Sequence, residues 1–287
     1  MKRVLILFHE SQRRKRPHYL IDALSEVWRK QGIHVAVAFG VRERLEADLL
    51  IPQVDLTHTP DEYIAYIRSF PAAVNRDVTD ISKRKISAFL LHGGEDYDGP
   101  VIVKTDNNCG GIPEHRLARR RHPLLAQARR KAVPVAECLL RRPFAWRSVS
   151  RRYPIYNSLA DVPACVFRNR ALVVERFLPE TDGTRYFMRH YLFLGDHTRS
   201  VRVAGPTPTL KRAECTLIDE GLPVPEEVLS MRRTLGLDYG KIDYTVQAGR
   251  VAVLDVNRTP SGPGTPEATA RTTGDLADGI WSLLPDK

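Results

Sequence analysis

The sequence has few cysteines and no long apolar run, and both absences restrict the classes of protein that it can encode. Four cysteines are spread over 287 residues without a C-x-x-C pair. With 43% hydrophobic and 27% charged residues, the composition excludes disulfide scaffolds, collagen-like chains and disordered proteins. The longest apolar stretch near the start, Val4–Phe8, is too short for the core of a signal peptide or for a membrane span. We therefore expect a reduced, cytoplasmic protein without a membrane segment.

A dinucleotide-binding fingerprint is also missing. The strand predicted at Arg3–Phe8 runs into a polar loop, His9–Arg16, that lacks the G-x-G-x-x-G pattern. An amphipathic helical pattern then opens at Pro17, and a second apolar strand follows at Val35–Phe39. This strand–helix–strand order predicts a parallel α/β lobe with a right-handed crossover.

Positive charge is concentrated in one segment. Residues 112–152 carry 12 basic and 2 acidic side chains, which accounts for the whole net charge of +10, because the two signs balance over the rest of the chain. This distribution argues against a generally basic protein. It leaves two interpretations, a basic insertion in a neutral enzyme or an arm that binds nucleic acid. Aromatic residues are sparse there, so a stacking platform for bases is poorly supported.

Two acidic residues and an asparagine fall on a predicted pair of strands, and they form the most informative pattern. The strands are expected at 239–247 and 250–256, around a tight turn. Asp255 and Asn257 share a face because side chains alternate along a strand, and Asp243 reaches that face from the neighbouring strand. Three converging oxygen donors suit Mg²⁺. Two solvated carboxylates beside a hairpin are the alternative interpretation.

A lysine at the end of a buried-type strand points to phosphate. Lys104 ends the run at 100–104, and the loop after it contains Gly110 and Gly111. An ammonium and backbone N–H groups can contact phosphate oxygens there, although the Walker A order is absent. The alternative is an ordinary turn with a lysine that reaches solvent.

A carboxylate lies on a later predicted strand, and an extended segment follows that strand. Glu175 lies on the strand predicted at 171–177, and Glu180 follows five residues later. Such a segment can offer backbone groups to the edge of a base and a carboxylate to ribose hydroxyls. An edge strand with exposed acids is the alternative.

In this order, these patterns resemble the ATP-grasp superfamily from about residue 75 to 265. The most specific part, 237–244 with 254–260, is similar to the family's metal region, g-x-D-(x)n-l-E/D-v-N-x-x-P. The resemblance implies an α/β class fold. An N-terminal parallel α/β lobe is followed in sequence by two lobes of α+β character that clasp ATP. The implied lobes are residues 1–78, residues 79–178 with the basic insertion 112–152, and residues 179–287 with the metal site.

The resemblance also implies ATP and Mg²⁺ as cofactors. Asp243, Asp255 and Asn257 are then the metal ligands. The helix predicted over 80–91 occupies the place of the family's first ATP-binding lysine. At the phosphates, the implied ATP contacts are Lys104 and Lys83, which is preferred over Lys85, and the loop that covers the phosphates contains Gly110 and Gly111. At the adenine, the implied contacts are Glu175, Phe177 and Leu178. At the ribose, the implied contact is Glu180, which is preferred over Asp182.

The implied reaction is that of a ligase, which phosphorylates a carboxylate with ATP and joins the acyl phosphate to an amine or another nucleophile. Lys241, Arg189 and Arg202 are the candidate catalytic cations. Lys241 stands where some of these ligases carry arginine, so it acts as a point charge and not as a bidentate fork. Asp255 stands where glutamate is common. The segment 112–152 is also more basic than is typical of the family.

The substrate expected from this charge is a small anionic molecule, and a homodimer is compatible with the resemblance. Two alternatives stay open. One is a kinase of the same fold that phosphorylates an anionic hydroxyl acceptor. The other is a nucleic-acid-binding protein that uses residues 112–152.

Overall fold

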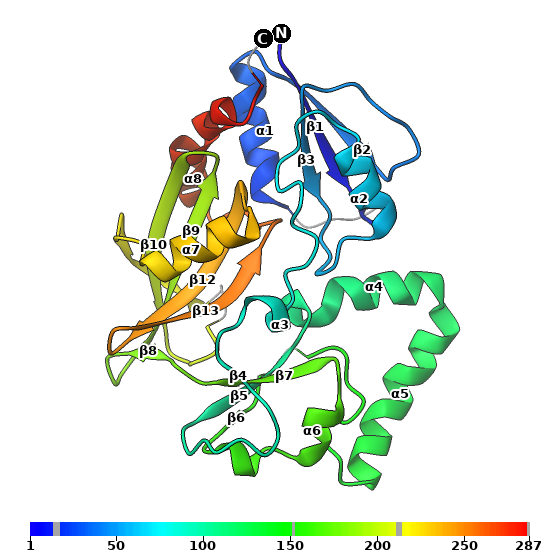
Figure 1. Cartoon of the computed structure of the whole chain (residues 1–287), viewed down its shortest axis with the longest axis vertical. Helices are drawn as coiled ribbons and strands as arrows, with labels where there is room; N and C mark the ends of the chain where they lie inside the picture. The colour runs from blue at the N-terminus through cyan, green and yellow to red at the C-terminus, as the bar shows by residue number, and fades with distance from the viewer. Residues whose placement is uncertain (14–17, 151–152, 211–213, 286–287) are drawn as a thin grey trace. The chain divides into compact units, whose positions relative to one another are not determined.

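The computed structural model describes residues 1–13, 18–150, 153–210 and 214–285 (Figure 1). By contacts, the chain divides into two compact units. Unit 1 contains Met1–Asp80 and Glu180–Lys287, and unit 2 contains Ile81–Pro179. Each unit is described by itself. Among the described residues, the helices lack the length and apolar character that crossing a membrane requires.

Unit 1 begins with a three-stranded parallel sheet of order β2-β1-β3. Its strands are β1 (Arg3–Phe8), β2 (His34–Phe39) and β3 (Leu49–Gln53), and its helices are α1 (Leu20–Lys30) and α2 (Asp61–Arg68). Alternate residues of β1 pack with α1 on one face and with α2 on the other. Burial on both faces explains why β1 is a continuous apolar run. The predicted parallel α/β lobe is thus confirmed.

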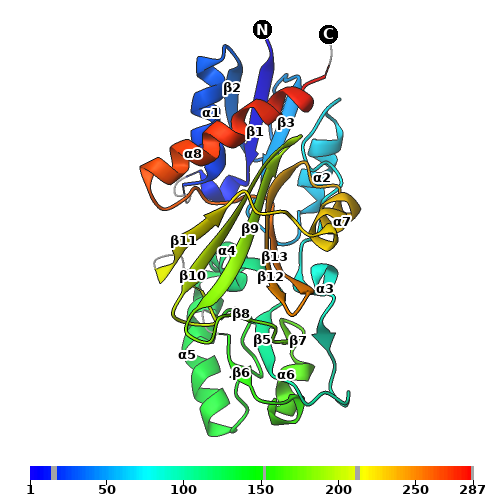
Figure 2. The ribbon, with the colours of Figure 1, turned by 90° about the vertical axis from the view of Figure 1, so that its left-hand side faces the viewer.

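Unit 1 also contains an antiparallel sheet of six strands, in which β11-β10-β9-β12-β13 are neighbours and β8 pairs with β9 (Figure 2). The strands are β8 (Glu180–Thr181), β9 (Tyr186–Leu194), β10 (His197–Gly205), β11 (Thr216–Glu220), β12 (Tyr239–Gln247) and β13 (Arg250–Asn257). Three helical segments accompany this sheet, namely α7 (Glu226–Leu235), α8 (Pro266–Leu276) and η5 (Ala277–Ser282). Helix α7 contacts β12 and β13, and α8 contacts β10 and α1.

The predicted hairpin is present. Ala248 and Gly249 both have positive φ, 48° and 76°, which is the backbone of the tight turns that join right-twisted strands. An extra residue on β13 at Leu254 makes a bulge. On the side of the bulge that contains Asn257, Asp243 lies opposite Asp255.

Unit 2 is built on a four-stranded antiparallel sheet of order β4-β7-β5-β6. The strands are β4 (Leu90–Leu91), β5 (Val101–Thr105), β6 (Ile155–Tyr156) and β7 (Leu172–Arg176). The predicted helix over 80–91 is wrong in extent. Only α3 (Lys83–Ile86) forms, because Leu90 and Leu91 pair with β7.

Residues 112–139 of the basic segment form two consecutive helices, α4 (Ile112–Arg121) and α5 (Pro123–Leu139), which contact each other (Figure 1), and residues 151–152 of the segment lie outside the described residues. Helix α5 continues through Pro134. Among the described residues, further short helices are η1 (Glu10–Gln12), η2 (Asn108–Gly111), η3 (Leu159–Asp161) and α6 (Ala164–Arg168).

Candidate functional site

Strands β12 and β13 bring the predicted metal ligands onto one face of the antiparallel sheet in unit 1. Asp243 lies opposite Asp255, and Lys241 lies opposite Asn257. Because side chains alternate along each strand, these four residues point to the same side of the sheet. The set therefore combines two carboxylates, one amide and one cation on adjacent strands.

Asp243 is buried and held by two partners. Its Oδ1 lies 2.6 Å from His190 Nδ1, and its Oδ2 lies 2.9 Å from Lys241 Nζ. Burial alone would raise the pKa of this carboxyl group, but the charge of Lys241 and the contact with His190 outweigh it and hold the pKa well below its usual range. Asp243 is therefore ionised at neutral pH.

His190 is a site residue that the sequence did not reveal. It lies on β9 directly opposite Asp243 in the ladder between β9 and β12. No histidine in the sequence has a metal-site spacing, and only the register between two distant strands identifies this one.

Asn257 is connected to the N-terminal lobe of unit 1 by a chain of polar contacts. Its Oδ1 accepts a hydrogen bond of 2.8 Å from the Thr259 N–H, and Thr259 Oγ1 lies 3.3 Å from Asp55 Oδ1. The Tyr19 hydroxyl donates to Asp55 Oδ2 over 2.9 Å, and Gln12 Nε2 donates to that hydroxyl over 2.8 Å. These contacts fix the orientation of the Asn257 amide.

Arg258, the residue after Asn257, anchors the loop to which both residues belong. Its buried guanidinium donates to Thr59 Oγ1 over 2.6 Å and to the Leu56 carbonyl over 2.7 Å, and it also contacts the Val78 carbonyl. Burial lowers the pKa of Arg258 to about 10. The anchored loop holds the end of β13, and thus Asn257, in place.

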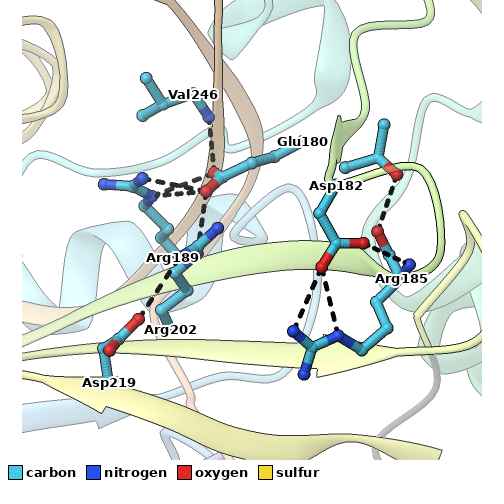
Figure 3. A network of polar contacts seen from close by, with 8 residues as sticks. Glu180, Asp182, Arg185, Arg189, Arg202, Asp219 and Val246 are labelled. Carbon is cyan, nitrogen blue, oxygen red and sulfur yellow. Dashed lines mark hydrogen bonds and ion pairs between the residues drawn. The ribbon is translucent and has the colours of Figure 1, made fainter.

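A second polar cluster in unit 1 is centred on Glu180 (Figure 3). Glu180 accepts hydrogen bonds from Arg189 Nε and Nη2 at 3.0 and 2.9 Å, and from the Val246 N–H at 2.9 Å. Arg202 Nε lies 2.9 Å from the same carboxylate. The guanidinium of Arg202 also stacks 3.9 Å from the ring centre of Phe187. Three hydrogen bonds and the ion pair with Arg202 therefore surround this carboxylate.

The two clusters lie on opposite faces of the sheet. Arg189 and His190 are consecutive on β9, so their side chains point to opposite sides. The register pairs Arg189 with Arg202 and pairs His190 with Asp243. The structure therefore places Lys241 beside Asp243, whereas Arg189 and Arg202 contact Glu180 on the other face.

In unit 2, a buried ion pair joins the ends of β5 and β7. Lys104 Nζ lies 2.6 Å from Glu175 Oε2, and both side chains are buried. Among the described residues, Glu175 Oε1 is buried and has no hydrogen-bond partner. An unsatisfied buried oxygen is costly, so this atom is one to which a ligand could donate a hydrogen bond.

The two candidate lysines of α3 differ in burial. Lys83 is buried, and its Nζ donates to Asn108 Oδ1 over 2.6 Å, whereas Lys85 is exposed. The Phe177 N–H donates to the Pro100 carbonyl over 2.8 Å, so it is not available to a nucleotide base.

The predicted phosphate loop has a left-handed backbone at three consecutive residues, Cys109, Gly110 and Gly111. A Cβ atom on Gly110 would collide with the Ser150 carbonyl, and one on Gly111 would lie 2.5 Å from the Ser148 carbonyl. The backbone at 148–150 thus lies so close to these two residues that only glycine fits there.

The donors present in unit 1 fit Mg²⁺. Within residues 1–13, 18–150, 153–210 and 214–285, no group of three or more His, Cys, Asp or Glu side chains is placed to hold a metal ion. The set Asp243, Asp255 and Asn257 instead offers two carboxylates and an amide oxygen on one sheet face, and hard cations such as Mg²⁺ prefer oxygen ligands.

A scan against protein-family models finds no match, and no curated protein matches in sequence. Solved structures do match over nearly the whole chain. An ATP-grasp RimK domain protein from Sphaerobacter thermophilus superimposes with a TM-score of 0.50 at 12% identity, over 99% of this chain and 100% of that one. The ATP-grasp ligase PsnB, solved with a variant of its minimal precursor, Mg and ADP, gives 0.53 at 10% identity over 99% of both chains. The chain has the ATP-grasp fold.

A third solved structure is also similar over nearly the whole chain. The macrocyclase MdnC from Microcystis aeruginosa, solved with its precursor peptide MdnA, gives a TM-score of 0.50 at 11% identity, over 99% of this chain and 100% of that one. The predicted fold class and the resemblance to ATP-grasp proteins are thereby confirmed. The roles given to single residues and the division into three lobes stay predictions.

Proposed function

We propose that this protein is an ATP- and Mg²⁺-dependent ligase that activates a carboxylate as an acyl phosphate and joins it to an amine or another nucleophile. The observation that carries the proposal is the facing pair Asp243 and Asp255, with Lys241 and Asn257 on the same side, in a chain with the ATP-grasp fold. Asp243, Asp255 and Asn257 hold Mg²⁺ in this proposal. A bound Mg²⁺ supplies the positive charge that phosphate oxygens require during phosphoryl transfer.

Lys241 and His190 have separate roles in this proposal. Lys241 contributes a fixed cation on the metal-binding face, where it stabilises negative charge that develops on the acyl phosphate. His190 orients Asp243 through its Nδ1 contact of 2.6 Å and is a positioning residue. Arg189 and Arg202 contact Glu180, so in this proposal they support the sheet beside the site rather than contact the reacting atoms.

The proposed nucleotide contacts in unit 2 are supported by burial and charge. Lys83 and Lys104 are buried cations that suit phosphate oxygens. The unpartnered Glu175 Oε1 suits an amino group such as that of adenine. Glu180 is engaged by both arginines and by the Val246 N–H in this structure, so a ribose contact from this residue would compete with these partners.

The acceptor is a carboxylate of unidentified structure. The expectation from charge is a small anionic molecule, and PsnB and MdnC among the similar structures carry precursor peptides. The test is a panel of carboxylates, including peptides, with amines, assayed for ADP release, with mass spectrometry of every positive reaction. ADP, phosphate and a new amide support the ligase. A phosphorylated substrate without phosphate release identifies a kinase instead.

The metal assignment has its own test. Asp255→Ala and Asn257→Ala should each abolish Mg²⁺-dependent ATP turnover while circular dichroism stays unchanged. Asp196→Ala, at the exposed turn between β9 and β10, is the matched control and should retain activity. Full activity in both site variants would contradict the assignment.

A further inference from the structure

Unit 2 contains a cavity of about 820 Å³ whose lining is dominated by arginine. Among the described residues that line it, none is aspartate or glutamate. The arginines are Arg129, Arg141, Arg142, Arg147, Arg168 and Arg170. Two of them, Arg168 and Arg170, lie outside the basic segment 112–152 in sequence, so folding concentrates the positive charge beyond what the sequence indicates.

Among the described residues, only one of these arginines has an acidic partner. Arg147 Nε lies 2.5 Å from Glu137 Oε2, and that glutamate is buried. Within the described part of the chain, the other five have no carboxylate within ion-pair distance, and all five are exposed. Unpaired cations in a concave surface concentrate positive potential and attract anions. Guanidinium groups pair bidentately with carboxylates and phosphates.

The wall of the cavity is held by specific contacts. Asn169 Nδ2 donates to the carbonyls of Phe144 and Arg147 over 2.7 and 2.8 Å. Arg141 and Phe144 have left-handed backbones, with φ of 48° and 64°, although neither is glycine. Such backbone costs free energy and persists only where surrounding contacts impose it. The Asn169 hydrogen bonds connect the segment that carries Arg147 to the segment that carries Arg168 and Arg170.

A second cavity with aliphatic side chains in its lining adjoins this one. It has a volume of about 680 Å³ and is also lined by Arg129, Trp146 and Arg147, and its remaining lining includes Leu125 and Val133. Leu125 is 64% exposed, and Leu124 and Leu139 of the same helix are 82% and 77% exposed, so α5 carries several exposed apolar side chains. The two cavities share Arg129, Trp146, Arg147 and Ser148, so they adjoin, and together they make up one trough. Its first part is cationic, and its second part carries aliphatic side chains beside Glu114, His115 and His122.

We propose that this trough binds an acidic peptide segment, with its carboxylates on the arginines and an apolar side chain in the second cavity beside Leu125. Charge complementarity selects an anionic occupant. The aliphatic side chains favour a peptide over single-stranded nucleic acid, whose binding sites commonly stack bases on aromatic side chains, because Trp146 is the one Trp, Tyr or Phe among the described lining of both cavities. This binding site goes beyond the proposed ligase chemistry and needs no nucleotide.

The test is fluorescence anisotropy without ATP, using a fluorescein-labelled peptide of repeating Glu-Glu-Leu and the wild-type chain. Arg142→Glu and Arg168→Glu should each weaken binding about tenfold or more, since each removes a charge-assisted pair and adds repulsion. Arg119→Glu is the matched control, because Arg119 is exposed on α4 and lines neither cavity. It should change the dissociation constant less than about twofold.

A second comparison isolates the aliphatic part of the trough. Leu125→Ser should weaken the Glu-Glu-Leu peptide and leave a Glu-Glu-Gly peptide unaffected. Equal loss in Arg119→Glu and the two cavity variants would overturn the proposal in favour of a diffuse basic surface. Tighter binding of labelled polyuridylate than of the peptide at the same salt concentration would overturn it in favour of nucleic acid. Absence of peptide binding at low salt would also overturn it, whatever the outcome of the ligase assay.

Discussion

His190 and Asp243 face each other on neighbouring strands, with His190 Nδ1 2.6 Å from Asp243 Oδ1. This contact and the Lys241 ion pair leave Asp243 with one fixed orientation on the face that also carries Asp255. A carboxylate that must bind a metal gains affinity when its orientation is set beforehand. The relationship therefore ties a residue of β9 to the proposed metal site.

Replacing His190 tests whether it positions Asp243 for metal binding. We expect His190→Ala to raise the Mg²⁺ concentration for half-maximal ATP turnover by about 10- to 100-fold, because Asp243 loses the group that orients it. His190→Asn should recover part of the affinity, since its amide can still donate near the Nδ1 position. The measurement is ATP turnover titrated with Mg²⁺. An unchanged Mg²⁺ dependence in His190→Ala would exclude a positioning role.

Glu180 is expected to stabilise the fold of unit 1. Glu180→Gln leaves Arg189 and Arg202 without their shared counter-charge, and breaking a buried ion pair from one side costs about 3 kcal/mol of unfolding free energy. Urea denaturation measures the loss. Asp182→Asn is the control, because Asp182 pairs with Arg185 at the exposed neighbouring turn (Figure 3), and its loss should be much smaller. Equal stability of Glu180→Gln and wild type, with weakened ATP binding, would instead favour the ribose role.

The loop glycines are expected to matter for packing. Gly110→Ala should destabilise the protein by more than Gly94→Ala, although both positions have positive φ. Gly94 has open space where a Cβ would go and pays only the left-handed backbone cost of about 1–2 kcal/mol. Gly110→Ala additionally collides with the Ser150 carbonyl. Urea denaturation of both variants separates the two costs, and equal values would show that residues 148–150 move away freely.

Asp238 gives a pH-dependent prediction. Burial raises the pKa of its carboxyl group, against the opposing effects of the Asn75 N–H and Arg232. A raised pKa in the folded state means that the stability from this group is greatest at low pH and is lost as pH rises through the folded pKa. Asp238→Asn should therefore gain stability relative to wild type as pH increases from acidic to neutral. Urea denaturation at several pH values tests this, and a difference independent of pH would contradict it.

The hairpin of the candidate site could be predicted closely from the sequence. The strands expected at 239–247 and 250–256 are observed at Tyr239–Gln247 and Arg250–Asn257. Alternation of apolar and polar residues fixes which side chains share a face, and the Ala248-Gly249 turn fixes the register of the pair. These are local properties, so a single sequence contains them.

Contacts between distant segments could not be predicted in the same way. The helix expected over 80–91 is replaced at its end by β4, since pairing with β7 overrides the local helical preference. His190 and Glu180 acquire their partners through the pairing of β9 with β12, β10 and β8, and nothing near them in sequence specifies that register. The arginine cavity likewise unites Arg129 with Arg168 through folding.

Strand β9 serves both polar clusters with consecutive residues, Arg189 and His190. Inserting one residue between Arg189 and His190 would turn Arg189 to the other side of the sheet relative to His190, and Arg189 would no longer meet Glu180. Changes in the length of β9 should thus be tolerated only in steps of two. The turn at 182–185 should accept single insertions, because it bears no such parity constraint.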